Sequence, residues 1–291
     1  MNYAFNWAST TSDADLGLAA NDGLYFSSLS NITGTYAFSY AFTEALFRNV
    51  YFPKLSSLTQ SYVFTRAFNC TANPTGALSG VHFPALTSTT GTYAFYQAFY
   101  GNKSIRDQSF PALSRVAGNY TFAQAFYGCP NVSAVRFPEL TAFLPAATYM
   151  WNQAMYSGTA GANTWPKCHI YCPKLISMRT NAANATFSIM SNQATAANRR
   201  SYAIHIGEEA DAISVNVGTT AANALFYNSR GLTDVYLHNL SSITGTAMLN
   251  GCSELTAIHF NENYETSIKA SNGWSTLWGR GAGAATVYFD L

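Results

Sequence analysis

A short pattern recurs along the chain in which a variable residue stands between apolar residues, as in Val81-His82-Phe83 and Val135-Arg136-Phe137. Alternate side chains of a β-strand point to opposite faces, so the middle residue of each pattern should point outward. The middle residues are Tyr51, His82, Ser109, Arg136, Tyr171, His205, Tyr236, His259 and Tyr288. Aromatic rings, hydroxyl groups and imidazole nitrogens in one exposed file suit the binding of a glycan or a partner protein.

Two interpretations of this file remain open. Neighbouring strands would hold the side chains about 5 Å apart, so the rings could simply stabilise the sheet by stacking across strands. Alternatively, the file lines an extended surface of the kind on which solenoid proteins bind their ligands. With imidazoles on that surface, ligand binding should weaken as the pH falls through about 6.5, where histidine gains charge.

The segment Cys168-His169-x-x-Cys172 contains zinc-binding residue types, but a structural zinc site needs four ligands and no second pair follows. We therefore expect buried thiols and no metal, although a disulfide between Cys168 and Cys172 remains open. The five cysteines of the chain are an odd number, which argues against a fully paired disulfide framework.

An acidic trio, Glu208, Glu209 and Asp211, could be imagined as the carboxylates of a glycosidase. Adjacent residues of an extended segment point in opposite directions, so a solvated loop is the better interpretation. The sequence contains no nucleophile elbow, zinc-protease, P-loop or dinucleotide motif. We expect no catalytic residue and no cofactor.

For these residues to lie in one file, their strands must be stacked by an internal repeat. Residues 93–113 and 120–140 are identical at ten of 21 aligned positions, which gives a period of 27 residues. A Phe-Pro-x-Leu signature recurs with spacings of 23 to 35 residues, so we expect residues 1–291 to form one solenoid domain of about nine irregular repeats. A single unit of this size cannot bury its apolar face, whereas stacked units share a continuous core.

Each repeat divides into three parts. A short parallel strand ends at the proline, and a turn follows at a glycine in four repeats, Gly34, Gly91, Gly118 and Gly245. The Tyr-Ala-Phe-x-x-Ala-Phe arm mixes two periodicities, and we expect a short helix or 3-10 turn there rather than irregular structure. Cys70, Cys129 and Cys252 share one slot after the arm and should be small buried residues of the stack.

Composition limits the classes of partner. Only 10% of residues are charged and the formal net charge is +1, so the clustered basic surface of a nucleic-acid binder is absent. No stretch approaches the roughly 18 apolar residues that a membrane span requires. A surface rich in Ser, Thr, Asn and Tyr favours an extracellular or particle-bound protein.

The pattern YAF..AF.GC..V..V.FP.L resembles the BspA-like class of leucine-rich repeats. The resemblance covers nearly the whole chain. It implies a curved, leucine-rich-repeat-like solenoid on a bacterial, protist or viral surface, usually engaged in adhesion or binding, and it transfers no catalytic residue. The repeats here are longer and less regular, and richer in tyrosine and phenylalanine.

We therefore expect a non-enzymatic extracellular recognition or adhesion module that binds a host or cell-surface glycan or protein on the concave face of its sheet. The ends match a repeat at Asn2-Tyr3-Ala4-Phe5 and a strand at 287–291, so we expect both ends to be uncapped, as in a fragment or in a protein whose ends meet other subunits. The alternative is therefore a structural subunit of a surface filament or virion appendage that self-associates end to end. A polysaccharide-cleaving solenoid enzyme would need a carboxylate cluster that the sequence does not offer.

Overall fold

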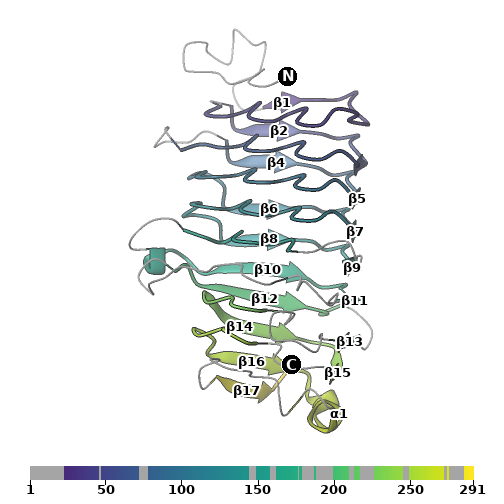
Figure 1. Cartoon of the computed structure of the whole chain (residues 1–291), viewed down its shortest axis with the longest axis vertical. Helices are drawn as coiled ribbons and strands as arrows, with labels where there is room; N and C mark the ends of the chain where they lie inside the picture. Colours follow the sequence, from purple (N-terminus) through teal and green to yellow (C-terminus); the bar gives the residue numbers. More distant parts are fainter. Residues whose placement is uncertain are drawn as a thin grey trace.

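The chain winds into a solenoid whose short parallel strands stack in sequence order along its long axis (Figure 1). This confirms the expected β-rich repeat fold. The computed structural model describes residues 23–45, 47–71, 78–143, 149–157, 162–175, 177–178, 187, 199–209, 213–216, 226–244, 249–271, 274 and 285–291.

One side of the stack, which we call the strand face, carries the strands that end in the Phe-Pro or related step. These are β1 (Leu24–Tyr25), β2 (Asn49–Tyr51), β4 (Gly80–His82), β6 (Asp107–Ser109), β8 (Ala134–Arg136), β10 (Cys168–Cys172), β12 (Tyr202–Ile206), β14 (Leu232–Leu237), β16 (Ala257–Phe260) and β17 (Thr286–Phe289). They form a three-stranded sheet, β1-β2-β4, and a seven-stranded sheet from β6 to β17.

A second side follows the turn at each proline. Its strands are β3 (Ser57–Leu58), β5 (Ser88–Thr89), β7 (Arg115–Val116), β9 (Ala142–Phe143) and β11 (Ser177–Met178), followed by the pair β13 (Ile213–Asn216) and β15 (Leu240–Thr244). All pairs are parallel, and β3 to β11 form one unbroken sheet. Proline is tolerated at the corner because the turn there needs no amide donor from it.

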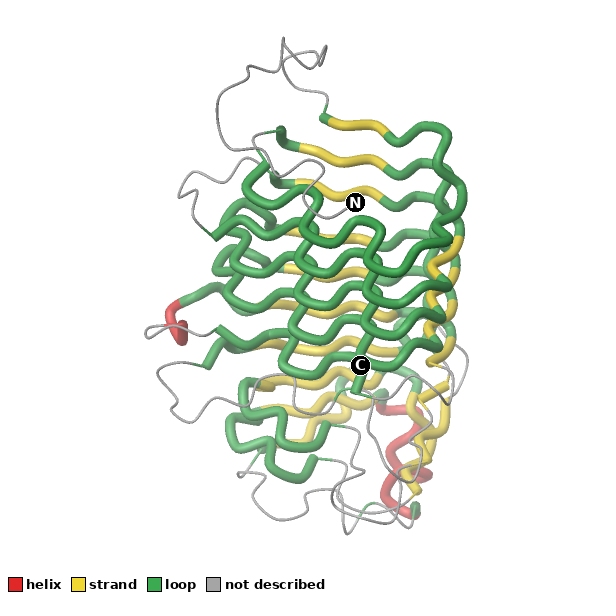
Figure 2. The backbone as a smooth tube through the Cα atoms, turned by 45° about the horizontal axis from the view of Figure 1, so that its top comes forward, coloured by secondary structure: helices red, strands yellow, loops and turns green. Residues whose placement is uncertain are grey.

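The Tyr-Ala-Phe arm forms the third side, and the expectation of a helix or 3-10 turn there is wrong. The arm is a wave of successive turns (Figure 2). Gln97 N donates to Ala123 O of the next coil at 3.0 Å, whereas Ala98 N donates to Phe95 O at 3.1 Å within the turn. Alternate amides therefore serve the neighbouring coil, which a helix would not permit because it uses them internally.

Every fourth residue of the arm adopts a left-handed conformation. The φ angles are 56° at Tyr93, 52° at Gln97 and 67° at Gly101, and the next coil repeats them at Tyr120 and Gln124. Non-glycine residues rarely adopt positive φ. Contacts between coils offset this cost, since Tyr93 stacks on Tyr120 at 4.8 Å and the Gln97 side-chain amide donates to that of Gln124.

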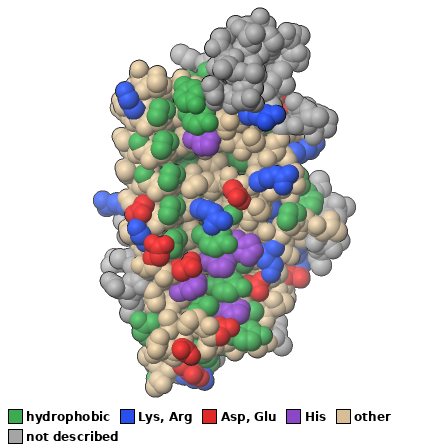
Figure 3. Space-filling view, turned by 180° about the vertical axis from the view of Figure 1, so that it is seen from behind, with side chains coloured by type: hydrophobic (Ala, Val, Ile, Leu, Met, Phe, Trp, Pro, Cys, Tyr) green, Lys and Arg blue, Asp and Glu red, His purple; other side chains and the backbone are tan. Residues whose placement is uncertain are grey.

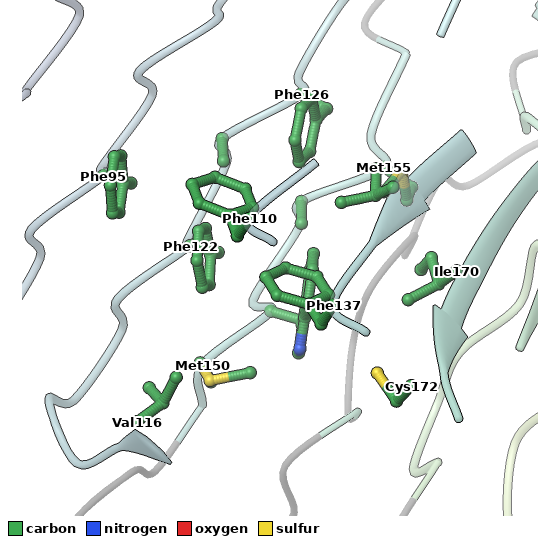
Figure 4. Packing of buried hydrophobic residues seen from close by; sticks show 14 of the residues in the cluster. Phe95, Phe110, Val116, Phe122, Phe126, Phe137, Met150, Met155, Ile170 and Cys172 are labelled. Carbon is green, nitrogen blue, oxygen red and sulfur yellow. The ribbon is translucent and has the colours of Figure 1, made fainter. Parts of the chain in front are cut away.

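The core consists of phenylalanine rings stacked from coil to coil. The ring centroids of Phe110 and Phe137 lie 5.1 Å apart at the strand side, and those of Phe95 and Phe122 lie 5.2 Å apart at the arm (Figure 4). All four rings are fully buried. Cys172 occupies the position of a strand phenylalanine and is buried, as are Cys70, Cys129 and Cys252, which agrees with the sequence analysis.

The glycines at the turn are required for a different reason from the one expected. A Cβ atom on Gly91 would lie 2.0 Å from Gln60 O, and one on Gly118 would lie 2.2 Å from Gly91 O. Neither glycine has a left-handed φ, so close approach of neighbouring coils is the constraint. A Cβ on Gly34 would meet Ala37 Cβ at an ordinary contact distance of 3.9 Å, and Gly245 lies outside the described residues.

Helical segments occur only as short insertions in the part of the chain that the structure describes: η2 (Ala162–Thr164), η5 (Glu262–Tyr264) and α1 (Glu265–Ala270). α1 packs against β15 at the end of the stack where the chain finishes (Figure 1), and its one buried side chain is Ile268. The repeat pattern of the sequence does not predict this helix.

Candidate functional site

The strand register places the predicted residues of the strand face in one file. Tyr51 pairs with His82 across β2 and β4, and from Ser109 on β6 every successive pair is in register up to Tyr288 on β17. The sequence analysis missed one member, Tyr25 on β1, which pairs with Tyr51. Leu24-Tyr25-Phe26 carries the same alternation and would have identified it. We call these ten residues the aromatic file: Tyr25, Tyr51, His82, Ser109, Arg136, Tyr171, His205, Tyr236, His259 and Tyr288.

The rings of the aromatic file stack face to face. Ring centroids lie 4.2 Å apart for Tyr25 and Tyr51 and 4.4 Å apart for Tyr51 and His82. Beyond Ser109 the stack resumes with the Arg136 guanidinium 4.3 Å above the Tyr171 ring. From Tyr171 to Tyr288 four further contacts of 4.2 to 4.8 Å follow. Because ring faces cover one another, the file presents mainly ring edges, hydroxyl groups and imidazole nitrogens to solvent.

Four histidines gather around the lower half of the file, where Figure 3 shows them interleaved with hydrophobic side chains. His169 Nδ1 lies 3.0 Å from His205 Nε2, and the His238 ring lies 6.5 Å from that of His205. Burial, reinforced by His169 and His238, lowers the pKa of His205 to about 4. Burial also lowers the pKa of His82, His169 and His238.

The imidazole of His205 is therefore neutral at pH 7 and stays neutral down to about pH 4, and the lowered pKa of His82, His169 and His238 favours their neutral forms as well. The sequence-based expectation that binding weakens near pH 6.5 assumed unperturbed histidines. Stacking buries the imidazoles and disfavours their charged form. We accordingly expect the pH sensitivity that arises from His82, His169, His205 and His238 to lie below pH 6.5.

Charges beside the file are paired. Lys167 Nζ lies 2.5 Å from Asp234 Oδ2, and Thr233 Oγ1 donates to the same oxygen. Burial alone would raise the pKa of Asp234, but the hydrogen bonds from Lys167 and Thr233 hold it below its ordinary value. At the last strand His259 Nδ1 lies 2.9 Å from Asp290 Oδ1.

The other candidate residues do not converge. Cys168 and Cys172 are buried free thiols, so they do not form a disulfide. Both cysteines lie on one side of β10 and His169 points to the other side, so the three side chains cannot bind one metal ion together. Within the described ranges no three His, Cys, Asp or Glu side chains form a group that could hold a metal ion. Glu208 and Glu209 are exposed in the turn after β12, and Asp211 lies outside the described residues.

No family model matches the chain, and no curated protein is similar to it. A leucine-rich repeat protein of known structure from Bacteroides ovatus aligns at 12% identity over 87% of this chain and 63% of its own length, with a TM-score of 0.28. This chain thus spans less than two thirds of that protein.

The stacked parallel strands and the repeated arm define the chain as a β-solenoid repeat protein. Of the helices that the structure describes, none has the length and apolar character needed to cross a membrane.

Proposed function

We propose that the chain is a non-enzymatic recognition module, displayed on a cell or virion surface, that binds a glycan along its aromatic file. The observation that carries this proposal is the unbroken stack of rings from Tyr171 to Tyr288, because it presents a regular row of phenol hydroxyl groups and imidazole nitrogens. The resemblance of the repeat to BspA-like surface proteins supports the location and the role in binding.

The chemistry of the strand face favours a glycan over a protein partner. Protein interfaces centre on aromatic or arginine side chains that insert into pockets of the partner, and rings stacked face to face within the file cannot insert individually. Among the described residues the exposed large hydrophobic side chains are Tyr25, Tyr36 and Tyr288, each of which carries a hydroxyl group. The imidazole nitrogens and phenol groups along the ring edges match the hydroxyl groups of a sugar.

The carboxylates beside the file support binding rather than cleavage. Glycosidases need one carboxylic acid whose pKa is raised so that it can donate a proton. The pKa of Asp234 is lowered, and its oxygen is held by Lys167 and Thr233. This carboxylate is therefore suited to fix the strand face and not to protonate a glycosidic oxygen.

A glycan array probed with the purified chain and two variants tests the proposal. Tyr236→Ala removes a ring from the centre of the file, and we expect a loss of affinity of about tenfold or more for any glycan that the chain binds. Tyr93→Ala is the matched control, since Tyr93 stacks between Tyr62 and Tyr120 at 4.9 and 4.8 Å on the arm instead of the strand face. Absence of glycan binding, or equal losses in both variants, would contradict the proposal.

A structural subunit is a second candidate, favoured by the ends of the file. Tyr25 and Tyr288 are 52% and 41% exposed, more than any other large hydrophobic residue of the described strands. A second copy that stacked on either ring would continue the file from one subunit to the next. Light scattering over a concentration series, with Tyr288→Glu as the variant, distinguishes assembly from a concentration-independent monomer.

A further inference from the structure

The strand face is interrupted between β4 and β6 because a polar residue points inward there. Val81 and Val135 fill the inward position on β4 and β8, whereas β6 has Gln108. The Gln108 side chain is buried and its Nε2 donates to Val81 O at 2.9 Å and to Ser109 O at 3.1 Å. The side-chain amide of Gln108 thus bonds to a carbonyl of β4 at the position where β4 and β6, although they are neighbours in the stack, do not pair as strands.

The interruption is local. Phe83 and Phe110, which follow β4 and β6, have ring centroids 5.9 Å apart, whereas the flanking pairs Phe52–Phe83 and Phe110–Phe137 are each 5.1 Å apart. On the opposite side of the same two coils β5 and β7 remain paired, with Ser88 opposite Arg115. The coils are therefore parted at the strand face alone.

A pocket of about 350 Å³ opens at this position. Its walls come from β2, β4, β6 and the turns that follow them, and include Tyr51, His82, Asp107, Gln108 and Ser109. The volume lies at the lower end of the range of about 300–1,000 Å³ that small-molecule sites occupy. It coincides with the position in the aromatic file where Ser109 supplies no ring.

The side chains that face this pocket are fixed in place. Tyr51 stacks on one face of His82 at 4.4 Å, and in the described part of the chain no ring or cation stacks on its other face. His82 Nε2 lies 3.1 Å from Asn49 Oδ1, and both atoms lie over Gly80, where a Cβ would be 2.7 and 2.4 Å from them. Glycine at this position is therefore what allows the Asn49–His82 contact and the fixed ring.

The pocket offers a carboxylate that can accept hydrogen bonds from a ligand. Asp107 is exposed, and its Oδ1 accepts from Ser133 Oγ at 2.8 Å, which leaves further lone pairs on a carboxylate. Burial lowers the pKa of His82, so the imidazole is uncharged at neutral pH. The lining contains this one carboxylate and no lysine or arginine. An aromatic face beside an acceptor carboxylate suits the apolar face and hydroxyl groups of a sugar ring.

We propose that the pocket between β4 and β6 binds one uncharged sugar ring, seated on the free face of His82 in the position left open by Ser109, with its hydroxyl groups donating to Asp107. This inference rests on the proposed glycan-binding function and names a subsite within it. The sugar would take the place of the ring that the aromatic file lacks at this coil.

Two variants close the pocket by different routes. Ser109→Tyr supplies the missing ring, and Gln108→Val restores the inward apolar residue of the neighbouring strands. Ser109→Ala is the matched control, since it removes the hydroxyl group and leaves the space open. The probes are the methyl glycosides of glucose, galactose, mannose and N-acetylglucosamine, with binding followed by saturation-transfer NMR and folding checked by thermal unfolding.

We expect weak binding of at least one glycoside, a loss of about tenfold or more in Ser109→Tyr and Gln108→Val, and little change in Ser109→Ala. If the chain binds glycans on the array through Tyr236 but both closing variants bind as well as the unmodified protein, the subsite is wrong and the proposed function stands. A chain that binds no glycan in either experiment overturns both.

Discussion

The imidazole of His205 lies 4.2 Å from the phenol ring of Tyr236 and within 3° of parallel to it. Such a stack leaves little room for the water that an imidazolium cation requires. The pairing therefore keeps His205 neutral and links the titration of this side chain to the stability of the strand face.

Acid should destabilise the protein through His205. Its pKa is about 4 in the folded protein and near 6.5 in the unfolded chain, so between these values the unfolded state binds more protons. Stability from this group is complete above pH 6.5 and is lost as the pH falls towards 4. We expect the slope of melting temperature against pH over this interval to be shallower in His205→Phe, which keeps the ring but cannot titrate. An NMR titration of His205 with a midpoint near 6.5 would contradict this.

Glycine should be essential at Gly91 and dispensable at Gly34. A methyl group on Gly91 would lie 2.0 Å from the carbonyl oxygen of Gln60, a backbone atom that cannot move aside as the end of a flexible side chain could. We expect Gly91→Ala to lower the free energy of unfolding by about 1–3 kcal/mol or more. Gly34→Ala, whose nearest neighbour is Ala37 Cβ at 3.9 Å, should be neutral or slightly stabilising. Urea unfolding of the two variants tests the difference, and equal effects would refute it.

Among the charged residues, Arg200 should be the one whose removal lowers the free energy of unfolding most. Its side chain is 1% exposed, and its guanidinium donates to the carbonyl oxygens of Cys129, Val132 and Pro166. Arg200→Met leaves these acceptors without their donor, so we expect a loss of about 3 kcal/mol in urea unfolding. Lys174→Ala, which breaks an exposed ion pair with Glu139, serves as the control and should leave the unfolding midpoint unchanged. A midpoint for Arg200→Met equal to that of the control would show that the carbonyls do not depend on the guanidinium.

The cysteines should be unreactive until the protein unfolds. Burial raises the pKa of Cys129 and Cys252 to about 12 and that of Cys168 to about 11, so little thiolate forms at neutral pH. We expect negligible alkylation by iodoacetamide at pH 8 in the native protein and five reactive thiols in urea without reductant. Ser109→Cys should add one thiol that reacts in the native state. Fewer than five thiols in urea would reveal a disulfide.

The register of the aromatic file could be predicted from the sequence because strands have an exact period of two. Once Val135 and Phe137 are assigned to the core, Arg136 must point outward, and the same argument places every other member. Cys172 could be assigned to the core in the same way. What stacking does to the histidines was not predictable, because the fall in the pKa of His205 depends on Tyr236 and His169, which come from other coils.

The arm was not predictable for a different reason. Tyr93 and Gln97 carry no sequence signal for a left-handed backbone, since that conformation is usually marked by glycine or asparagine. It is imposed by the adjacent coil, which supplies acceptors to alternate amides and stacking partners to the tyrosines. The break at β6 did have a signal. Gln108 in place of an inward valine marks a buried polar residue that must find a partner.

Half of the amides in the arm are bonded parallel to the long axis of the solenoid, as Gln97 is to Ala123. A force that pulls the two ends of the stack apart is therefore applied directly along these bonds, and each coil passes the load only to its neighbours. Under tension the coils should separate one after another, and each event should release one repeat. The protein would then lengthen in many small steps over a narrow range of force. This lengthening would limit the force that acts on a bound partner.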